Sequence, residues 1–143
     1  MSTSARERQR AFGTGRITAQ RAAIVDSIAT GGRAFTIDSL VESTHARDSS
    51  IGVATVYRAV SAMEESGWLE RVGERNGSVL YARCAQGGHH HHVICTTCGR
   101  LELADCPFEA LTASVATASG FVMTGHDVTL YGLCPDCAPT RRD

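Results

Sequence analysis

Two Cys-x-x-Cys pairs, the first preceded by four consecutive histidines, constrain the fold of this 143-residue chain more than any other feature. The histidine run is His89, His90, His91 and His92, and the cysteines are Cys95, Cys98, Cys134 and Cys137. Thiolate and imidazole are ligands that zinc prefers, and two such pairs a few dozen residues apart supply the four sulfurs of a closed tetrahedral site. The four cysteines therefore predict a structural zinc site in the C-terminal half of the chain.

Three alternative roles for these histidines and cysteines fit less well. Expression tags contain histidine runs, but tags lie at termini and this run lies inside the chain. A thioredoxin-like pair at Cys134 and Cys137 would begin a helix, and Pro139 with the few residues after it leaves no room for one. A disulfide framework needs an oxidising compartment, whereas residues 1–10 are polar and lack the apolar core of a signal peptide. We therefore expect a cytoplasmic protein.

Composition and charge fit a small protein of two modules. A hydrophobic content of 43% can bury one modest core or two small ones, and small cores often need a metal. No segment approaches a transmembrane span. The net charge of -1 argues against a general nucleic-acid binder, but the charge is uneven. Residues 1–84 hold 11 arginines and 9 acidic residues, whereas residues 85–143 hold 3 and 6.

The first half of the sequence predicts three helices followed by a β-hairpin. Thr18 and Thr36 are suited to cap the first two helices. The third helix places one apolar stripe at helical spacing, formed by Val53, Val56, Val60 and Met63. Residues 68–72 and 78–84 are strand candidates, and Asn76-Gly77 between them is a strong hairpin signal. This order of elements indicates a winged helix-turn-helix.

In a winged helix-turn-helix the third helix enters the DNA major groove. Its outward face carries Thr55 and Arg58, with Tyr57 at the edge, and these side chains can bond phosphates or a base edge. Arg16 and Arg21 add positive charge to the same half of the chain, and they are further candidates for contact with DNA. The alternative is an ordinary solvated helix face.

Three motifs together carry a family resemblance. They are Arg-Ile-Thr-Ala-Gln-Arg at 16–21, Val-Ala-Thr-Val-Tyr-Arg at 53–58, and the histidine run with both cysteine pairs. In this order they resemble the ferric-uptake-regulator (Fur) family, most of all its zinc-uptake-regulator (Zur) branch, over about residues 10 to 137. The resemblance implies an α+β fold and a homodimeric, metal-dependent repressor of transcription. Its parts would be a winged-helix DNA-binding domain at 1–84, a hinge at 85–88 and a small α/β dimerisation domain at 89–143.

The C-terminal half independently predicts a small mixed unit. Residues 93–95 and 100–103 suggest short strands, and residues 121–133 suggest a long final strand. Pro107 is suited to begin a helix with three residues directed inward, namely Phe108, Leu111 and Val115. Because this unit is small, an intermolecular sheet between two copies would help it to bury its apolar surface.

Strand geometry divides the histidine run into two pairs. Successive side chains of an extended segment point to opposite sides, so His89 and His91 share one side, and His90 and His92 the other. Two further metal sites can then be built, and the resemblance implies the same ligands. The site across the hinge is Glu70, Cys84, His90 and His92, and the site within the C-terminal domain is His89, His91, Glu109 and His126.

Three residues in and around these sites carry an open question. Glu70 departs from the shorter aspartate often found in the Zur branch, which leaves the denticity of that ligand open. Glu109 could instead complete the N-terminus of a helix. Cys106 has no assigned partner, and we expect a packed thiol there.

Cys84 favours zinc as the sensed metal, because iron and manganese sites prefer nitrogen and oxygen ligands. We therefore expect up to three zinc ions per protomer and a repressor of zinc-uptake genes. Metal across the hinge would favour a closed dimer that binds a double-stranded DNA operator. Four protein ligands per site argue against a hydrolase, and we expect no small-molecule substrate. The alternatives are a peroxide- or iron-responsive regulator of the same family, or a zinc-storage or chaperone protein.

Overall fold

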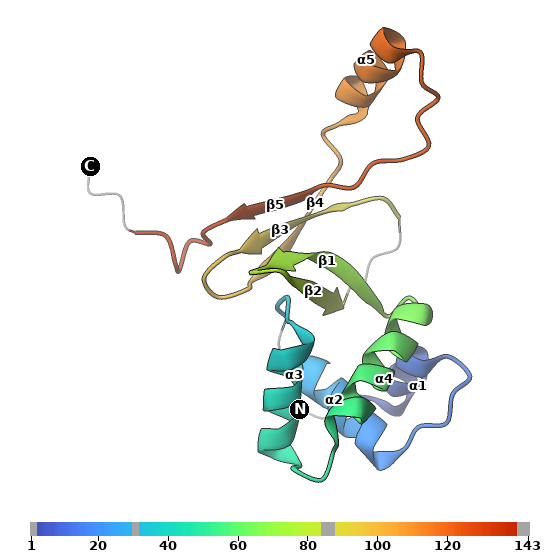
Figure 1. Ribbon diagram of the computed structural model, residues 1–143, viewed down its shortest axis with the longest axis vertical. Coiled ribbons are helices and arrows are strands. Elements are labelled where there is room, and N and C mark those ends of the chain that lie inside the picture. Colours follow the sequence, from blue (N-terminus) through green and yellow to red (C-terminus); the bar gives the residue numbers. More distant parts are fainter. Residues whose placement is uncertain (1–2, 30–31, 84–87, 140–143) are drawn as a thin grey trace.

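The computed structural model describes residues 3–29, 32–83 and 88–139, and Figure 1 shows a helical N-terminal part beneath two small sheets. The mixed helix and sheet fold is the α+β class predicted from the sequence. The helices are α1 (Ala5–Phe12), α2 (Ala19–Ala29), α3 (Ile37–Arg47), α4 (Val53–Glu65) and α5 (Glu109–Ser119). The strands are β1 (Leu69–Arg75), β2 (Ser78–Arg83), β3 (His91–Cys95), β4 (Leu101–Ala104) and β5 (Thr129–Gly132). In the described part of the chain, no helix is long and apolar enough to cross a membrane.

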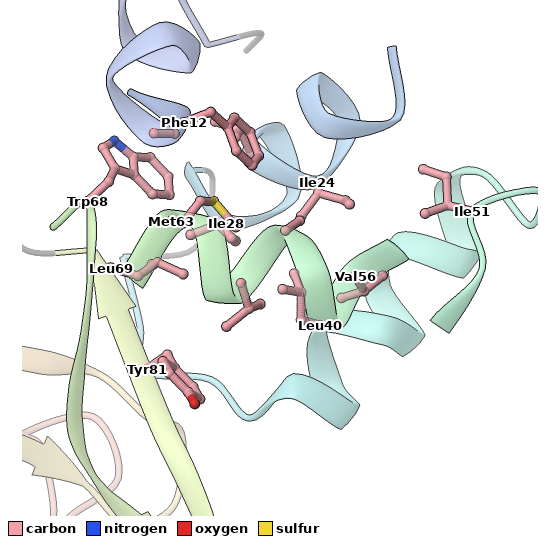
Figure 2. Packing of buried hydrophobic residues seen from close by; sticks show 14 residues of the cluster. Phe12, Ile24, Ile28, Leu40, Ile51, Val56, Met63, Trp68, Leu69 and Tyr81 are labelled. Atoms are coloured by element: carbon pink, nitrogen blue, oxygen red, sulfur yellow. The ribbon is translucent and has the colours of Figure 1, made fainter. Parts of the chain in front are cut away.

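The N-terminal helices pack around one apolar core (Figure 2). The Thr36 side chain accepts a hydrogen bond from the Ser39 backbone N–H and so caps α3, as predicted. On α4 the predicted stripe is buried at Val56, Val60 and Met63. Val53 was predicted to belong to this stripe, but its side chain is 48% exposed. It is the first residue of α4 and lies beyond the end of the core, so the helical period alone could not show its exposure.

One helix was not predicted. Helix α1 precedes the three expected helices, and the Ser4 side chain caps it by accepting from the Glu7 backbone N–H. Ala11 and Phe12 at its end are buried in the core (Figure 2). The sequence shows no helical period here, because residues 6–10 are all polar and only the last turn of the helix contributes buried apolar residues.

The predicted hairpin is present between α4 and the second sheet. Strands β1 and β2 pair antiparallel from Leu69↔Arg83 to Arg75↔Ser78, with a register shift between Arg71 and Gly73. Asn76 and Gly77 have φ values of 51° and 78°, the left-handed conformation that a two-residue hairpin turn requires.

The second sheet has the order β4-β3-β5, with β4 antiparallel and β5 parallel to the central strand. The long final strand predicted over 121–133 is wrong, because β5 covers only Thr129–Gly132. The reason is the length of its partner. Strand β3 has 5 residues, and β5 pairs with it only from His92↔Thr129 to Cys95↔Gly132.

Helix α5 stands away from the sheet at the top of Figure 1. No residue of this fully described helix is buried. Leu111 and Val115 were predicted to point inward, but they are 60% and 43% exposed within this single chain. The helix extends beyond the sheet (Figure 1), so these two side chains remain exposed in the single chain.

The hairpin and the second sheet lie against each other. Val72, Leu80 and Ile94 belong to a second, smaller core that joins β1 and β2 to β3. Two hydrogen bonds cross the same boundary. The Thr129 hydroxyl donates to the Val72 carbonyl at 2.7 Å, and the Glu74 backbone N–H donates to the Tyr131 hydroxyl at 2.8 Å. The structure therefore has the N-terminal unit docked on the sheet. Of the predicted hinge, only Gly88 is among the described residues.

Candidate metal centres and nucleic-acid interface

The four-cysteine cluster consists of Cys95, Cys98, Cys134 and Cys137, whose sulfur atoms all lie within 4.8 Å of one another. The parallel pairing of β3 and β5 explains this convergence. Each cysteine pair lies at or just after the C-terminal end of its strand, and Cys95 stands beside Gly132 in the register. The Sγ atoms of Cys98 and Cys134 are 3.7 Å apart, and the Cys134 backbone N–H donates to the Cys95 Sγ at 3.4 Å.

The thiols of this cluster compete for ionisation. Backbone N–H groups, first that of Cys98 and then that of Cys134, lower the pKa of the Cys95 thiol to about 6. The pKa of Cys137 moves in the opposite direction, to about 12, chiefly because its thiol hydrogen-bonds with Cys134. Without a cation, one thiolate in such a cluster makes ionisation of the next unfavourable. A divalent ion removes that repulsion, so the donor set and its electrostatics fit a four-thiolate zinc site.

The bridging cluster consists of Glu70 on β1 with His90 and His92 around the start of β3. The Glu70 Oε2 lies 3.7 Å from the His90 Nε2 and 3.9 Å from the His92 Nε2. The fourth predicted member, Cys84, lies outside the described residues. The cluster therefore brings one carboxylate from the hairpin to two imidazoles from the second sheet.

Both histidines of the bridging cluster have a ring nitrogen that can donate a lone pair to a metal ion. The His90 Nδ1–H donates to the Gly88 carbonyl at 2.9 Å, which leaves Nε2 unprotonated in the neutral ring. That Nε2 is buried and has no hydrogen-bond partner among the described residues. Burial lowers the pKa of His92, so its ring is neutral at neutral pH. A buried lone pair without a proton donor is the arrangement expected of a metal ligand.

The distal cluster consists of His89, His91, Cys106 and His126. The His126 Nε2 lies 2.8 Å from the His89 Nε2 and 3.1 Å from the His91 Nε2. Burial, followed by the neighbouring His126 and His91, lowers the pKa of His89. The two histidine pairs of the run thus lie in separate clusters, with His89 and His91 in this one.

The distal cluster differs from its predicted ligand set at one residue. Glu109 does not join the cluster, because it is exposed at the first position of α5, where an acidic side chain favours the helix dipole. Cys106 occupies the cluster instead, with its Sγ 3.1 Å from the His126 Nε2. The sequence did not indicate this position for two reasons. Cys106 forms no Cys-x-x-Cys pair with another cysteine, and the sequence does not show where the segment before α5 lies relative to the sheet.

The residues predicted to contact DNA lie in two places. Tyr57 and Arg58 are exposed on α4, Thr55 is partly buried beside them, and Arg58 makes no hydrogen bond or ion pair with another described residue. Arg16 is exposed on the loop before α2. Arg21 is held within the fold, since its guanidinium donates to the Arg16 carbonyl at 2.9 Å and lies 4.6 Å over the Phe12 ring.

A helical unit with a wing, docked on a sheet with three groups of metal-binding side chains, defines a winged-helix protein with a metal-binding C-terminal unit. Residues 13–131 match the model of the Ferric uptake regulator family. The chain belongs to this family, whose members are metal-responsive regulators of transcription rather than enzymes.

Individual relatives agree with this assignment. The "Zinc uptake regulation protein" of Mycobacterium tuberculosis is 37% identical over 123 residues, which are 85% of this chain and 94% of the relative. Among solved structures, the ferric uptake regulator from Francisella tularensis with iron has a TM-score of 0.67 and 28% identity, covering 87% of this chain and 96% of that chain. A zinc-bound manganese uptake regulator has a TM-score of 0.63 and 29% identity, covering 91% of this chain and 95% of that chain.

Proposed function

We propose that this chain is a zinc-responsive repressor of zinc-uptake genes, acting in the cytoplasm as a homodimer on a DNA operator. The convergence of Glu70 from the hairpin with His90 and His92 from the second sheet carries this proposal. Cys84 follows β2 directly in the sequence and would complete the set with a thiolate. One thiolate, two imidazoles and one carboxylate suit zinc better than iron or manganese. The relative named as a zinc uptake regulation protein supports the same metal.

The protein's own residues would couple this site to DNA binding. A bound zinc ion supplies the positive charge that lets the carboxylate, thiolate and imidazoles share one site. Glu70 then stays beside His90 and His92, and the Thr129 and Tyr131 hydrogen bonds hold the hairpin on the sheet. With its hairpin held, α4 keeps a fixed orientation relative to the dimerisation unit. Because such linkage is reciprocal, operator binding would also tighten zinc binding.

The homodimer follows from the apolar surface of the C-terminal unit. Side chains on α5, on the loop after it and on β5 are exposed together in the single chain, namely Leu111, Val115, Phe121, Val122 and Leu130. Single exposed apolar residues are common, but a run of this kind along one unit is typical of an interface. We infer that a second copy covers this surface, so that two α4 helices meet successive major grooves, about 34 Å apart.

Contacts with DNA are assigned to the exposed side of α4. Thr55, Tyr57 and Arg58 would reach the groove, where a guanidinium can bond a guanine edge or a phosphate. Arg16 would contact the phosphate backbone, and Arg21 would position the Arg16 loop through its hydrogen bond to the Arg16 carbonyl.

Three zinc ions per protomer are proposed. The four-cysteine cluster would hold a structural ion, and the bridging cluster with Cys84 the regulatory one. The distal cluster would hold the third ion.

The proposed domain division is a DNA-binding domain at 1–84, a hinge at 85–88 and a dimerisation domain at 89–143.

The test compares two glutamates of the same strand. Glu70→Gln should remove one zinc per protomer and weaken zinc-dependent operator binding by at least about tenfold, since even losing a group that only supports a ligand commonly costs that much. Glu74→Gln is the matched control, because Glu74 is exposed on β1 and lies outside the clusters. The operator is a duplex selected from a random library in the presence of zinc, and fluorescence anisotropy measures binding.

The proposal fails if zinc does not promote binding to any selected duplex. It also fails if Glu70→Gln and Glu74→Gln respond alike to zinc. If manganese or iron promotes operator binding at the same concentration and zinc does not, the chain responds to that other metal.

A further inference from the structure

The fourth member of the distal cluster is the unexpected one. Cys106 lies between β4 and α5, in a segment that approaches His91 and His126. Its Sγ is 3.1 Å from the His126 Nε2, and the ligand atoms of all four residues lie within 4.8 Å of one another. Tetrahedral zinc holds its ligand atoms about 3.3 to 3.8 Å apart, given bonds of about 2.0 to 2.3 Å. The cluster is therefore compact enough to enclose a single ion after small side-chain adjustments.

The histidine rings present the correct nitrogen atoms to this position. The His91 Nδ1–H donates to the Val128 carbonyl at 3.3 Å, so the Nε2 of the neutral ring carries the free lone pair. A backbone carbonyl on the far nitrogen is the usual support of a metal-bound histidine. The Phe108 ring meets the His91 ring edge-on, with centroids 5.3 Å apart, and so shields one side of the cluster. His91 itself is 2% exposed.

Packing does not account for Cys106. The residue is only partly buried, and it belongs to neither apolar core in the described part of the chain. The segment that contains it leads into α5, none of whose residues is buried. A bond from Cys106 to an ion held by His89, His91 and His126 would fasten the start of α5 to the sheet.

We propose that the Cys106 thiolate, and not the Glu109 carboxylate, is the fourth ligand of the distal cluster. This inference rests on the proposed function only in taking the distal cluster to bind a metal. Three imidazoles and one thiolate form a closed tetrahedral set for zinc or another thiophilic divalent cation. Manganese and magnesium, which prefer oxygen ligands, would bind it weakly. Metal at this position would also anchor the helix that carries part of the proposed dimer surface.

Cobalt(II) tests the ligand directly, because thiolate-bound cobalt has a sulfur-to-metal charge-transfer absorption in the near ultraviolet. The full chain is prepared as Cys84→Ser, with one zinc retained per protomer in the four-cysteine cluster. Of the 6 cysteines, Cys106 is then the only one outside that cluster. One equivalent of cobalt per protomer should produce the charge-transfer band. A chromophoric chelator should detect no zinc released from the four-cysteine cluster, which shows that the band does not come from cobalt in that cluster.

Three variants in this background assign the band. Cys106→Ser should abolish it and weaken cobalt binding by at least about tenfold. Cys106→Asp should restore cobalt binding without the band, since a carboxylate can replace the thiolate as a ligand. Glu109→Gln should leave both the band and the affinity unchanged. Circular dichroism of each variant verifies that the fold is retained.

Two outcomes would overturn the proposal. Cobalt binding without a charge-transfer band, together with lost affinity in Glu109→Gln, would assign the ligand to Glu109. If His126→Ala leaves cobalt binding unchanged, the distal cluster is not a metal site. Neither outcome affects zinc-dependent operator binding of the unaltered chain, which tests the proposed function separately.

Discussion

Adjacent histidines of this chain have different neighbours although their chemistry is the same. His90 and His92 lie beside Glu70 of the hairpin, whereas His89 and His91 lie beside His126 and Cys106. The ring pairs show the same division, since the His90 ring contacts His92 at a centroid distance of 5.0 Å and the His89 ring contacts His91 at 4.7 Å. The period of two along an extended segment is enough to produce it.

A comparison of two alanine variants tests this division. His90→Ala should behave like Cys84→Ser and abolish zinc-activated operator binding, while the dimer and the four-cysteine zinc persist. His89→Ala should group with His126→Ala, lose a different zinc and retain an operator response. Metal content and anisotropy titrations measure both effects. Graded and equal defects in His89→Ala and His90→Ala would instead indicate one pooled cluster.

At the scale of elements, the contact between β1 and β5 positions the wing. Gly73 follows the register shift in β1, and a Cβ atom there would collide with the Tyr131 hydroxyl. This close approach lets the Glu74 N–H donate to that hydroxyl at 2.8 Å. Hydrogen bonds therefore hold the hairpin on the sheet independently of the metal proposed for the bridging cluster.

Tyr131→Phe removes only the hydroxyl of this contact. The loss should cost about 0.5 to 1.5 kcal/mol, the usual net contribution of one hydrogen bond. Because the bond is made in the docked arrangement, operator binding should need up to about tenfold more zinc, with three zinc ions still bound at saturation. A zinc titration at constant operator concentration measures the shift. An unchanged zinc dependence would show that this bond does not contribute to the docked state.

At the scale of the whole molecule, two small apolar cores depend on different supports. The larger core joins four helices to the hairpin and includes Trp68, the only tryptophan of the chain. The smaller core has few buried residues, and the apolar surface of α5 and β5 is exposed in the single chain. We therefore expect the C-terminal unit to depend on the proposed four-cysteine zinc and on a second copy more than the N-terminal unit does.

Cys137→Ser should remove the support of the C-terminal unit and leave the N-terminal core intact. Structural zinc supplies on the order of 10 kcal/mol of folding free energy in small domains, so this variant should lose one zinc per protomer and dissociate into monomers. Trp68 fluorescence should stay that of a buried indole, because the N-terminal core does not involve this cluster. Sedimentation and metal analysis check the outcome. A stable dimer without that zinc would contradict the structural role of the cluster.

Local patterns predicted the elements whose signals lie within a few residues. The Asn76-Gly77 turn and the Thr36 cap were recognisable because turn and cap chemistry is local. Helix α1 was missed because one buried turn is too little for a periodic pattern, and β5 was overestimated because its length depends on β3. Leu111 and Val115 look like core residues in the sequence, but both side chains are exposed in the described part of the single chain.

The sequence by itself determined the ligand types and their order along the chain: two cysteine pairs, a histidine run and the winged-helix pattern before them. Their meeting was decided by tertiary structure. Parallel pairing of β3 with β5 brings the two cysteine pairs together, and docking of the hairpin brings Glu70 to His90 and His92. The choice between Cys106 and Glu109 depended on where α5 begins relative to the sheet. Spacing along a chain limits which residues can meet, whereas the packing of the strands fixes which residues do.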